Sequence, residues 1–225
     1  MKNWFPFTDY DFYAYLTSGG LALAVFDLLT TGGLWLARAD WTFVQIVLVI
    51  AASYVIGQIA ASVASLVIEH GLARWLLPSP ASVQLGVRKQ GMAGRLIGRI
   101  VVGRYYTPFS EPIREKIWST AAAKLGIPRE ALSDPETVFQ VAFGAARSDQ
   151  DTRERIDGFR NQYGFCRNMA LVALVCAISL AVPAGIDATL NSLAALLAVV
   201  ALGMTIRFLK FYSAFAADVL RALLR

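Results

Sequence analysis

The sequence predicts an all-α membrane protein with four transmembrane helices in two hairpins, a small helical region between the second and third spans, and an amphipathic C-terminal helix. Three observations predict this class. The 225 residues are 56% hydrophobic and 16% charged, against about 25% charged in soluble domains. Four runs with one charge or none approach or exceed the length that spans a bilayer. The polar residues gather mainly in one stretch, 78–167.

The first predicted hairpin covers residues 1–77. Residues 1–13 hold one base, many aromatic side chains and no small-residue cleavage site, so they suit an interfacial anchor rather than a signal peptide. The first span is 14–36. The second span, 41–68, contains 28 residues without a charge. As a helix it measures about 42 Å, against about 30 Å of hydrocarbon, so it tilts or projects past one interface.

The region 78–167 is the predicted cytoplasmic part, and turn chemistry divides it into helices. A Ser-Glu-Pro start at 110–112 and a stop at Gly126 bound one helix. An Asp-Pro-Glu start at 134–136 opens another that ends near Arg147. A third helix begins at 148–149, and we expect it to continue into the third span.

The second predicted hairpin covers residues 168–206, with spans of about 168–182 and 188–206 around a tight turn. The tail, 207–225, carries its charges on one stripe and apolar side chains on much of the rest. That pattern predicts an amphipathic helix, which lies either at the membrane interface or against the polar region.

Charge predicts the orientation of the four spans. Of the 21 Lys and Arg residues, 15 lie in 69–167 and four in the tail, whereas Arg38 alone lies in a turn on the opposite side. Basic residues remain on the cytoplasmic side of membrane helices. We therefore expect a multi-pass protein of the bacterial inner membrane with both termini in the cytoplasm, and we expect no direct partner among nucleic acids.

A few polar side chains fall inside the predicted spans, and their role stays open between structure and conduction. Asp27 is the only charge within a span, and it needs a partner, a proton or water there. Thr42, Gln45, Asn191 and Arg38 are at suitable estimated depths to bond it. The intramembrane polar residues as a group are Asp27, Gln45, Tyr54 and Gln58.

Small residues recur every four positions on the second span. These are Ser53, Gly57, Ala61 and Ser65. Small side chains at this spacing let two helices approach closely in lipid. The stripe therefore indicates a helix contact, either with another span of the same chain or with a second subunit.

A basic, glycine-punctuated segment follows the second span. Its basic residues are Arg88, Lys89, Arg95, Arg99 and Arg104. It lacks the GK[ST] of a phosphate-binding P-loop. We favour a surface that lies against anionic lipid headgroups, with a pocket for a nucleotide, lipid head or acidic partner as the alternative.

No catalytic or metal-binding motif is recognisable, and we expect neither a cofactor nor enzymatic activity. His70 is the only histidine, which leaves a zinc site short of ligands. No serine has a GxSxG context. Cys166 and Cys176 are ten residues apart on one expected helix, about 15 Å, too far to form a disulfide with each other.

Three patterns resemble those of uncharacterised bacterial inner-membrane proteins with four spans and a cytoplasmic insertion. They are Tyr10-Asp11-Phe12 with Tyr15-Leu16, then Tyr54-x2-Gly57-Gln58, then Tyr163-Gly164-Phe165-x-Arg167-Asn168. They cover a small part of the chain. The resemblance implies the build described above and brings no activity or catalytic residue with it.

Three functions are compatible with these features. The first is a non-enzymatic membrane module that forms homo-oligomers and whose cytoplasmic region binds a protein partner or signal. By analogy of build, it could serve a bacterial defence or stress system and change ion permeability when activated. The second is a small transporter or constitutive channel with Asp27 in the path. The third, which we rank last, is a membrane enzyme that acts on lipid.

Overall fold

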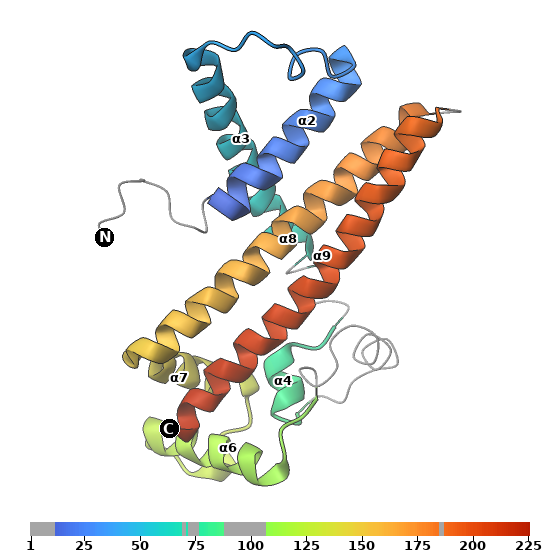
Figure 1. Cartoon of the computed structure of the whole chain (residues 1–225). Helices are drawn as coiled ribbons and strands as arrows, with labels where there is room; N and C mark the ends of the chain where they lie inside the picture. Colours follow the sequence, from blue (N-terminus) through green and yellow to red (C-terminus); the bar gives the residue numbers. More distant parts are fainter. Residues whose placement is uncertain (1–11, 69–70, 72–76, 88–106, 185–186) are drawn as a thin grey trace. The chain divides into compact units, whose positions relative to one another are not determined.

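The computed structural model describes residues 12–68, 71, 77–87, 107–184 and 187–225, which form helices joined by turns (Figure 1). Among these residues, four helices are long and apolar enough to cross a membrane. They are Ala14–Thr31, Phe43–Ile68, Gln150–Val182 and Ala188–Leu224. The all-helical class and the presence of four candidate spans, both predicted from the sequence, are confirmed.

The chain divides into two compact units. Unit 1 comprises Met1–His70 and Gly164–Thr205, and unit 2 comprises Gly71–Tyr163 and Ile206–Arg225. Two long helices, α8 (Gln150–Ala184) and α9 (Ala188–Arg221), each contribute residues to both units.

Unit 1 opens with a turn of π-helix, η1 (Phe12–Leu16), which leads directly into α2 (Thr17–Thr31). The next helix, α3 (Phe43–Ala64), packs closely against both. A Cβ added at Gly19 would overlap the carbonyl oxygen of Ser53, and one added at Gly57 would overlap the carbonyl oxygen of Tyr15. The two backbones therefore touch at this crossing, which only glycine permits on either side.

The small-residue stripe of α3 faces this contact along most of its length. Ser53, Gly57 and Ala61 are buried, but the next fully buried position is Ala64, while Ser65 is half-buried. An α-helix has 3.6 residues per turn, so a step of four residues turns about 400°, which is about 40° more than one full turn. Residues spaced strictly by four therefore move gradually off the face that contacts the partner helix. The packing partner of the stripe lies in the same chain.

The first span ends earlier than predicted. The sequence extends it to residue 36, but α2 ends at Thr31, where Gly32 (φ 71°) and Gly33 (φ 83°) adopt left-handed conformations. Glycine takes this conformation without the penalty that a Cβ would bring. The predicted four-residue turn, 37–40, is correspondingly part of a longer connection from Gly32 to Thr42.

The unit 1 parts of α8 and α9 pack against each other and against α2. A buried cluster joins Val172, Cys176 and Leu180 of α8 to Leu197 of α9 and Val25 of α2. The third predicted helix therefore continues into the membrane-spanning segment, as the sequence indicates, because no break interrupts α8 between Gln150 and Ala184.

Unit 2 has its own hydrophobic core. It is built by α4 (Pro80–Gln84), α6 (Glu111–Leu125), η5 (Arg129–Ala131), α7 (Pro135–Ser148), the first turns of α8, the last turns of α9 and η6 (Ala222–Leu224). Ile117, Val138, Ile156 and Leu220 are among its most buried members. The predicted starts and stops of α6 and α7 are confirmed, whereas the short helix α4 was not predicted.

The C-terminal tail is not the separate helix that the sequence suggests. It continues the fourth span as the last turns of α9, and Phe215, Val219, Leu220 and Leu223 enter the core of unit 2. Its apolar face is therefore buried by protein. The sequence analysis placed the tail either at the membrane interface or against the polar region, and in the structure it packs against the polar region.

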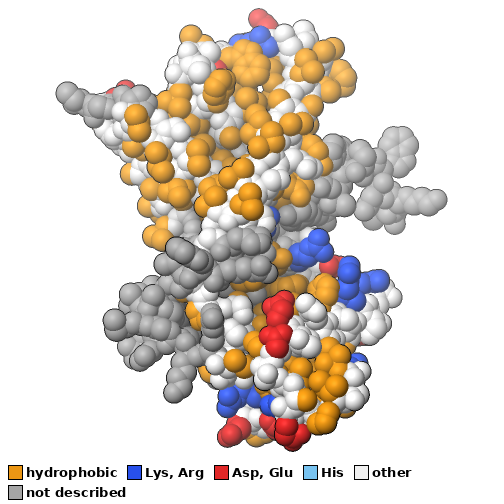
Figure 2. Space-filling view, turned by 180° about the vertical axis from the view of Figure 1, so that it is seen from behind, with side chains coloured by type: hydrophobic (Ala, Val, Ile, Leu, Met, Phe, Trp, Pro, Cys, Tyr) orange, Lys and Arg blue, Asp and Glu red, His pale blue; other side chains and the backbone are white. Residues whose placement is uncertain are grey.

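The two units differ in their surfaces (Figure 2). Hydrophobic side chains cover much of unit 1, and charged side chains gather on unit 2. Examples on unit 1 are Phe43, which is 80% exposed, together with Leu48, Ile59, Val182 and Val199. An apolar surface of this kind is what a lipid-facing helix needs.

The helix crossing predicts unequal effects for two neighbouring glycines. Gly19→Ala and Gly57→Ala should each lower the free energy of unfolding by about 1–3 kcal/mol or more, because a methyl group would push the backbones apart. Gly20→Ala is the matched control, since a Cβ there would meet only the Ser53 hydroxyl at an ordinary 3.9 Å. Unfolding in mild detergent measures all three, and equal stability of the Gly19 and Gly20 variants would contradict the contact.

Candidate functional site

Asp27, the only charge predicted inside a span, is 2% exposed and has partners within its own hairpin. Its carboxylate accepts hydrogen bonds from the Thr31 hydroxyl at 2.5 Å and from the Leu36 backbone N–H at 2.9 Å. The backbone carbonyl of Asp27 accepts from the N–H of Gly33. Asp27 thus fastens the Gly32–Leu36 turn onto the end of α2.

Three of the four partners predicted for Asp27 are engaged elsewhere. Thr42 and Gln45 bond each other in a capping box that starts α3, with the Thr42 N–H donating to Gln45 Oε1 at 3.0 Å. The Arg38 guanidinium lies over the Trp41 ring, 4.3 Å from its centroid. The prediction that Thr42, Gln45 or Arg38 bonds Asp27 is therefore wrong. Thr42 and Gln45 cap α3 instead. Arg38 stacks on Trp41, and its buried Nε has no hydrogen-bond partner among the described residues.

The other two predicted intramembrane residues, Tyr54 and Gln58, bond each other. Gln58 Nε2 donates to the Tyr54 hydroxyl at 2.8 Å, one turn apart on α3. The Tyr54 ring meets Tyr15 edge-on, with 5.8 Å between centroids. Tyr54 and Gln58 lie at the α2–α3 crossing. Asp27 lies near the C-terminal end of α2 and Gln45 near the N-terminal end of α3. The four residues therefore do not form one site.

The sequence reasoning missed several buried polar residues, among them two in unit 1. Ser18 and Asn168 are both fully buried, and both side chains donate to the carbonyl oxygen of Ala14, at 2.7 Å and 3.5 Å. This ties α8 to η1 inside unit 1. The available signal for Asn168 was a polar residue in an apolar helix, since such groups bond across helices in lipid.

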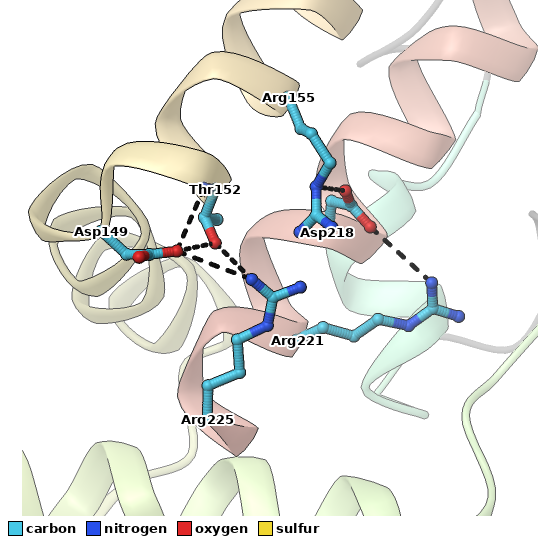
Figure 3. Close-up of polar contacts among 6 residues, drawn as sticks. All are labelled: Asp149, Thr152, Arg155, Asp218, Arg221 and Arg225. Atoms are coloured by element: carbon cyan, nitrogen blue, oxygen red, sulfur yellow. Dashed lines mark hydrogen bonds and ion pairs between the residues drawn. The ribbon is translucent and has the colours of Figure 1, made fainter.

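Unit 2 contains a network of charges between the start of α8 and the end of α9 (Figure 3). Arg225 donates to the Thr152 hydroxyl at 2.6 Å and lies 3.6 Å from the Asp149 carboxylate, which also accepts a short hydrogen bond from Thr152. A second group of three pairs Asp218 with Arg155 at 3.4 Å and with Arg221 at 3.8 Å.

The pKa of the Asp149 carboxyl is lowered from its ordinary value. The hydrogen bond from the Thr152 hydroxyl is the main cause, and the Thr152 N–H and the positive charge of Arg225 add to it. A lowered pKa keeps this carboxylate ionised, as its role at the first turn of α8 requires. The same holds for Asp134 at the start of α7, bonded by Thr137.

Several predicted site residues lie outside the described residues. These are the basic segment Arg88, Lys89, Arg95, Arg99 and Arg104, and also Glu69 and His70. Within the ranges that the structure describes, no group of three or more His, Cys, Asp or Glu side chains is arranged to hold a metal ion. Cys166 and Cys176 are buried and are not joined in a disulfide.

No protein-family model, curated protein or solved structure matches this chain. Its polar clusters are small and local, and they serve helix capping, turn closure or helix contacts. This arrangement can position helices precisely relative to their neighbours within a unit, and it lacks a converging set of acids, bases and nucleophiles among the described side chains.

The hydrogen bonds of Asp27 are expected to stabilise the fold, and comparing Thr31 with its neighbour Thr30 tests this. Asp27→Asn and Thr31→Val should each lower the free energy of unfolding by about 1–3 kcal/mol, because each leaves a partner in the turn unsatisfied. Thr30→Val is the control, since the Thr30 hydroxyl bonds only the Phe26 carbonyl on an exposed face. Unfolding in detergent measures the three variants, and the effects of Asp27→Asn and Thr31→Val should be less than additive. Additive losses, or a loss in the Thr30 variant of similar size, would contradict the turn-closing role.

Proposed function

We propose that the chain is a non-enzymatic, multi-pass module of a bacterial inner membrane whose unit 2 binds a protein partner or signal. The observation that carries this proposal is the sharing of α8 and α9. Each helix contributes its apolar part to the core of unit 1 and its other end to the separate core of unit 2. A partner that binds unit 2 would therefore contact the ends of two membrane helices.

The spans form two hairpins in this proposal, with both termini and unit 2 in the cytoplasm. Short connections between α2 and α3 and between α8 and α9 support the hairpins. The distribution of Lys and Arg supports the orientation, because the connection from Gly32 to Thr42 holds one base and the residues of unit 2 hold most of the others.

Self-association remains part of the proposal, with a changed interface. The stripe of α3 is occupied by α2 of the same chain, so a homo-oligomer would use another face. Exposed apolar side chains on α3, α8 and α9 leave such faces available to a second copy as well as to lipid. A change of ion permeability on activation would need an assembly of this kind.

The contacts of Asp27 favour this module over a channel or transporter with Asp27 in the path. A conducting carboxylate has to face water, whereas that of Asp27 is buried and bonded by Thr31 and Leu36. A lipid-acting enzyme remains the least supported of the three functions, because the described polar side chains do not converge at one depth.

A single added cysteine tests the topology on which the proposal rests. Ala37→Cys, in the first connection, should react with a membrane-impermeant maleimide on intact cells. Ser133→Cys, on the surface of unit 2, should react only after the membrane is opened. Both positions are exposed, so accessibility within the protein does not limit either reaction.

The parent protein is the matched control for this labelling, because its two cysteines are buried and should stay unlabelled in both conditions. The same preparation, purified in mild detergent, gives the mass of the assembly and any proteins that co-purify. Labelling of Ser133→Cys from outside would overturn the orientation. A monomer that co-purifies with no other protein would overturn the proposed role as a partner-binding module.

A further inference from the structure

The connection between α2 and α3, residues 32–42, contains one basic residue, Arg38. Its guanidinium lies over the Trp41 ring, 4.3 Å from the ring centroid. The Trp35 ring meets the Trp41 ring at an angle of 63°, with 5.7 Å between the two centroids. One cation and two tryptophans of the same connection therefore lie together, and we call these three residues the Arg38 cluster.

Arg38 has no anionic partner in the part of the chain that the structure describes. It makes no hydrogen bond or ion pair there, and its Nε is buried without a partner. Asp40, the only acid in the connection, is exposed. Asp27 accepts instead from Thr31 and Leu36. Because burial removes water from Nε, the guanidinium has lost part of its solvation. Its Nη groups are not enclosed as Nε is, so their N–H donors are open to an anion.

Helix length places the Arg38 cluster at the level of the lipid headgroups. The first candidate span, Ala14–Thr31, has 18 residues. As a helix it measures about 27 Å, close to the roughly 30 Å of the hydrocarbon layer. Arg38 and the two tryptophans follow the end of this span. Tryptophan is enriched at this level of membrane proteins because its ring is apolar and its indole N–H is polar.

Exposed apolar side chains adjoin the Arg38 cluster. Leu34 is 75% exposed and Phe43 is 80% exposed. Val44, Val47 and Leu48 continue this surface along α3. The helices α2 and α3 lie apart near the connection and meet only further along, at the glycine crossing (Figure 1). An anion that reaches Arg38 here therefore has apolar surface beside it, which suits a lipid better than a free phosphate ion.

We propose that the Arg38 cluster binds the phosphate of a phospholipid headgroup. The Nη groups of Arg38 donate to the phosphate oxygens, and the Trp41 ring holds the plane of the guanidinium. The acyl chains lie along the exposed apolar side chains of α3. Since the phosphate is common to phospholipids, the site does not require a headgroup with net negative charge. The site rests on the membrane placement of unit 1 in the proposed function, and it is independent of which side unit 2 occupies.

Native mass spectrometry of the full chain, stripped of lipid and released from neutral detergent micelles, tests the site by counting bound lipids. The first phosphatidylcholine should bind more tightly than further copies do. Diacylglycerol with the same acyl chains lacks the phosphate, and it should bind at least about tenfold more weakly. Inorganic phosphate at equal concentration lacks the acyl chains and should leave no bound ion.

Three variants assign the binding to the Arg38 cluster. Arg38→Gln should raise the dissociation constant of the first phosphatidylcholine at least about tenfold, because it removes the charged donors. Trp41→Leu should raise it at least about threefold, because the guanidinium loses its support. Arg147→Gln is the matched control. Arg147 also lies over a ring, 5.3 Å from the centroid of Phe143 in unit 2, and its variant should bind as the parent does.

The unfolding temperature of each variant without lipid checks that it folds, and Trp41→Leu carries the test if the Arg38 variant does not fold. Unchanged binding in the folded variants would overturn the site. An equal loss in the Arg147 variant would overturn it too, because it would indicate a general effect of charge. Diacylglycerol that binds as tightly as phosphatidylcholine would show that the phosphate is not recognised. The topology of the spans would stand in each case, since the cysteine labelling measures it separately.

Discussion

The close backbone approach of α2 and α3 is the contact on which unit 1 depends. In hydrocarbon, helices gain nothing from leaving the solvent, so their association relies on packing and on polar bonds between them. Gly19 and Gly57 bring the two backbones together. Beside this contact, the Ala14 carbonyl accepts from Ser18 and from Asn168, and the second of these bonds joins α8 to η1.

A second constraint acts on the two long helices, α8 and α9. Each has one part in unit 1 and one part in unit 2, and the surroundings of the two parts differ. Within unit 1 they expose apolar side chains, and within unit 2 they bury apolar side chains and pair their charges. The sequence of α9 changes character at Arg207, from an uncharged run to alternating bases and aromatic residues.

Much of the fold could be predicted from the sequence, because hydrophobic length and capping residues are local signals. The spans, and the boundaries of α6 at Ser110 and Gly126, follow from them. The partners of Asp27 could not be predicted. A depth estimate cannot register that Gly32 and Gly33 turn the chain back, and this turn places Leu36 over the carboxylate. The bond of Asn168 to the Ala14 carbonyl joins segments far apart in the sequence, which no local pattern records.

The proposed function requires that the apolar helices lie in the membrane, and spin labels in reconstituted bilayers measure this placement directly. Labels at Leu196, Val199 and Leu202 of α9 occupy exposed positions, and labels at Lys124 and Ser133 occupy exposed positions of unit 2. If the placement is correct, oxygen relaxes the α9 labels more strongly than a water-soluble nickel complex does. For the labels on unit 2, the nickel complex is the stronger of the two relaxing agents. Similar exposure of both sets to the nickel complex would contradict it.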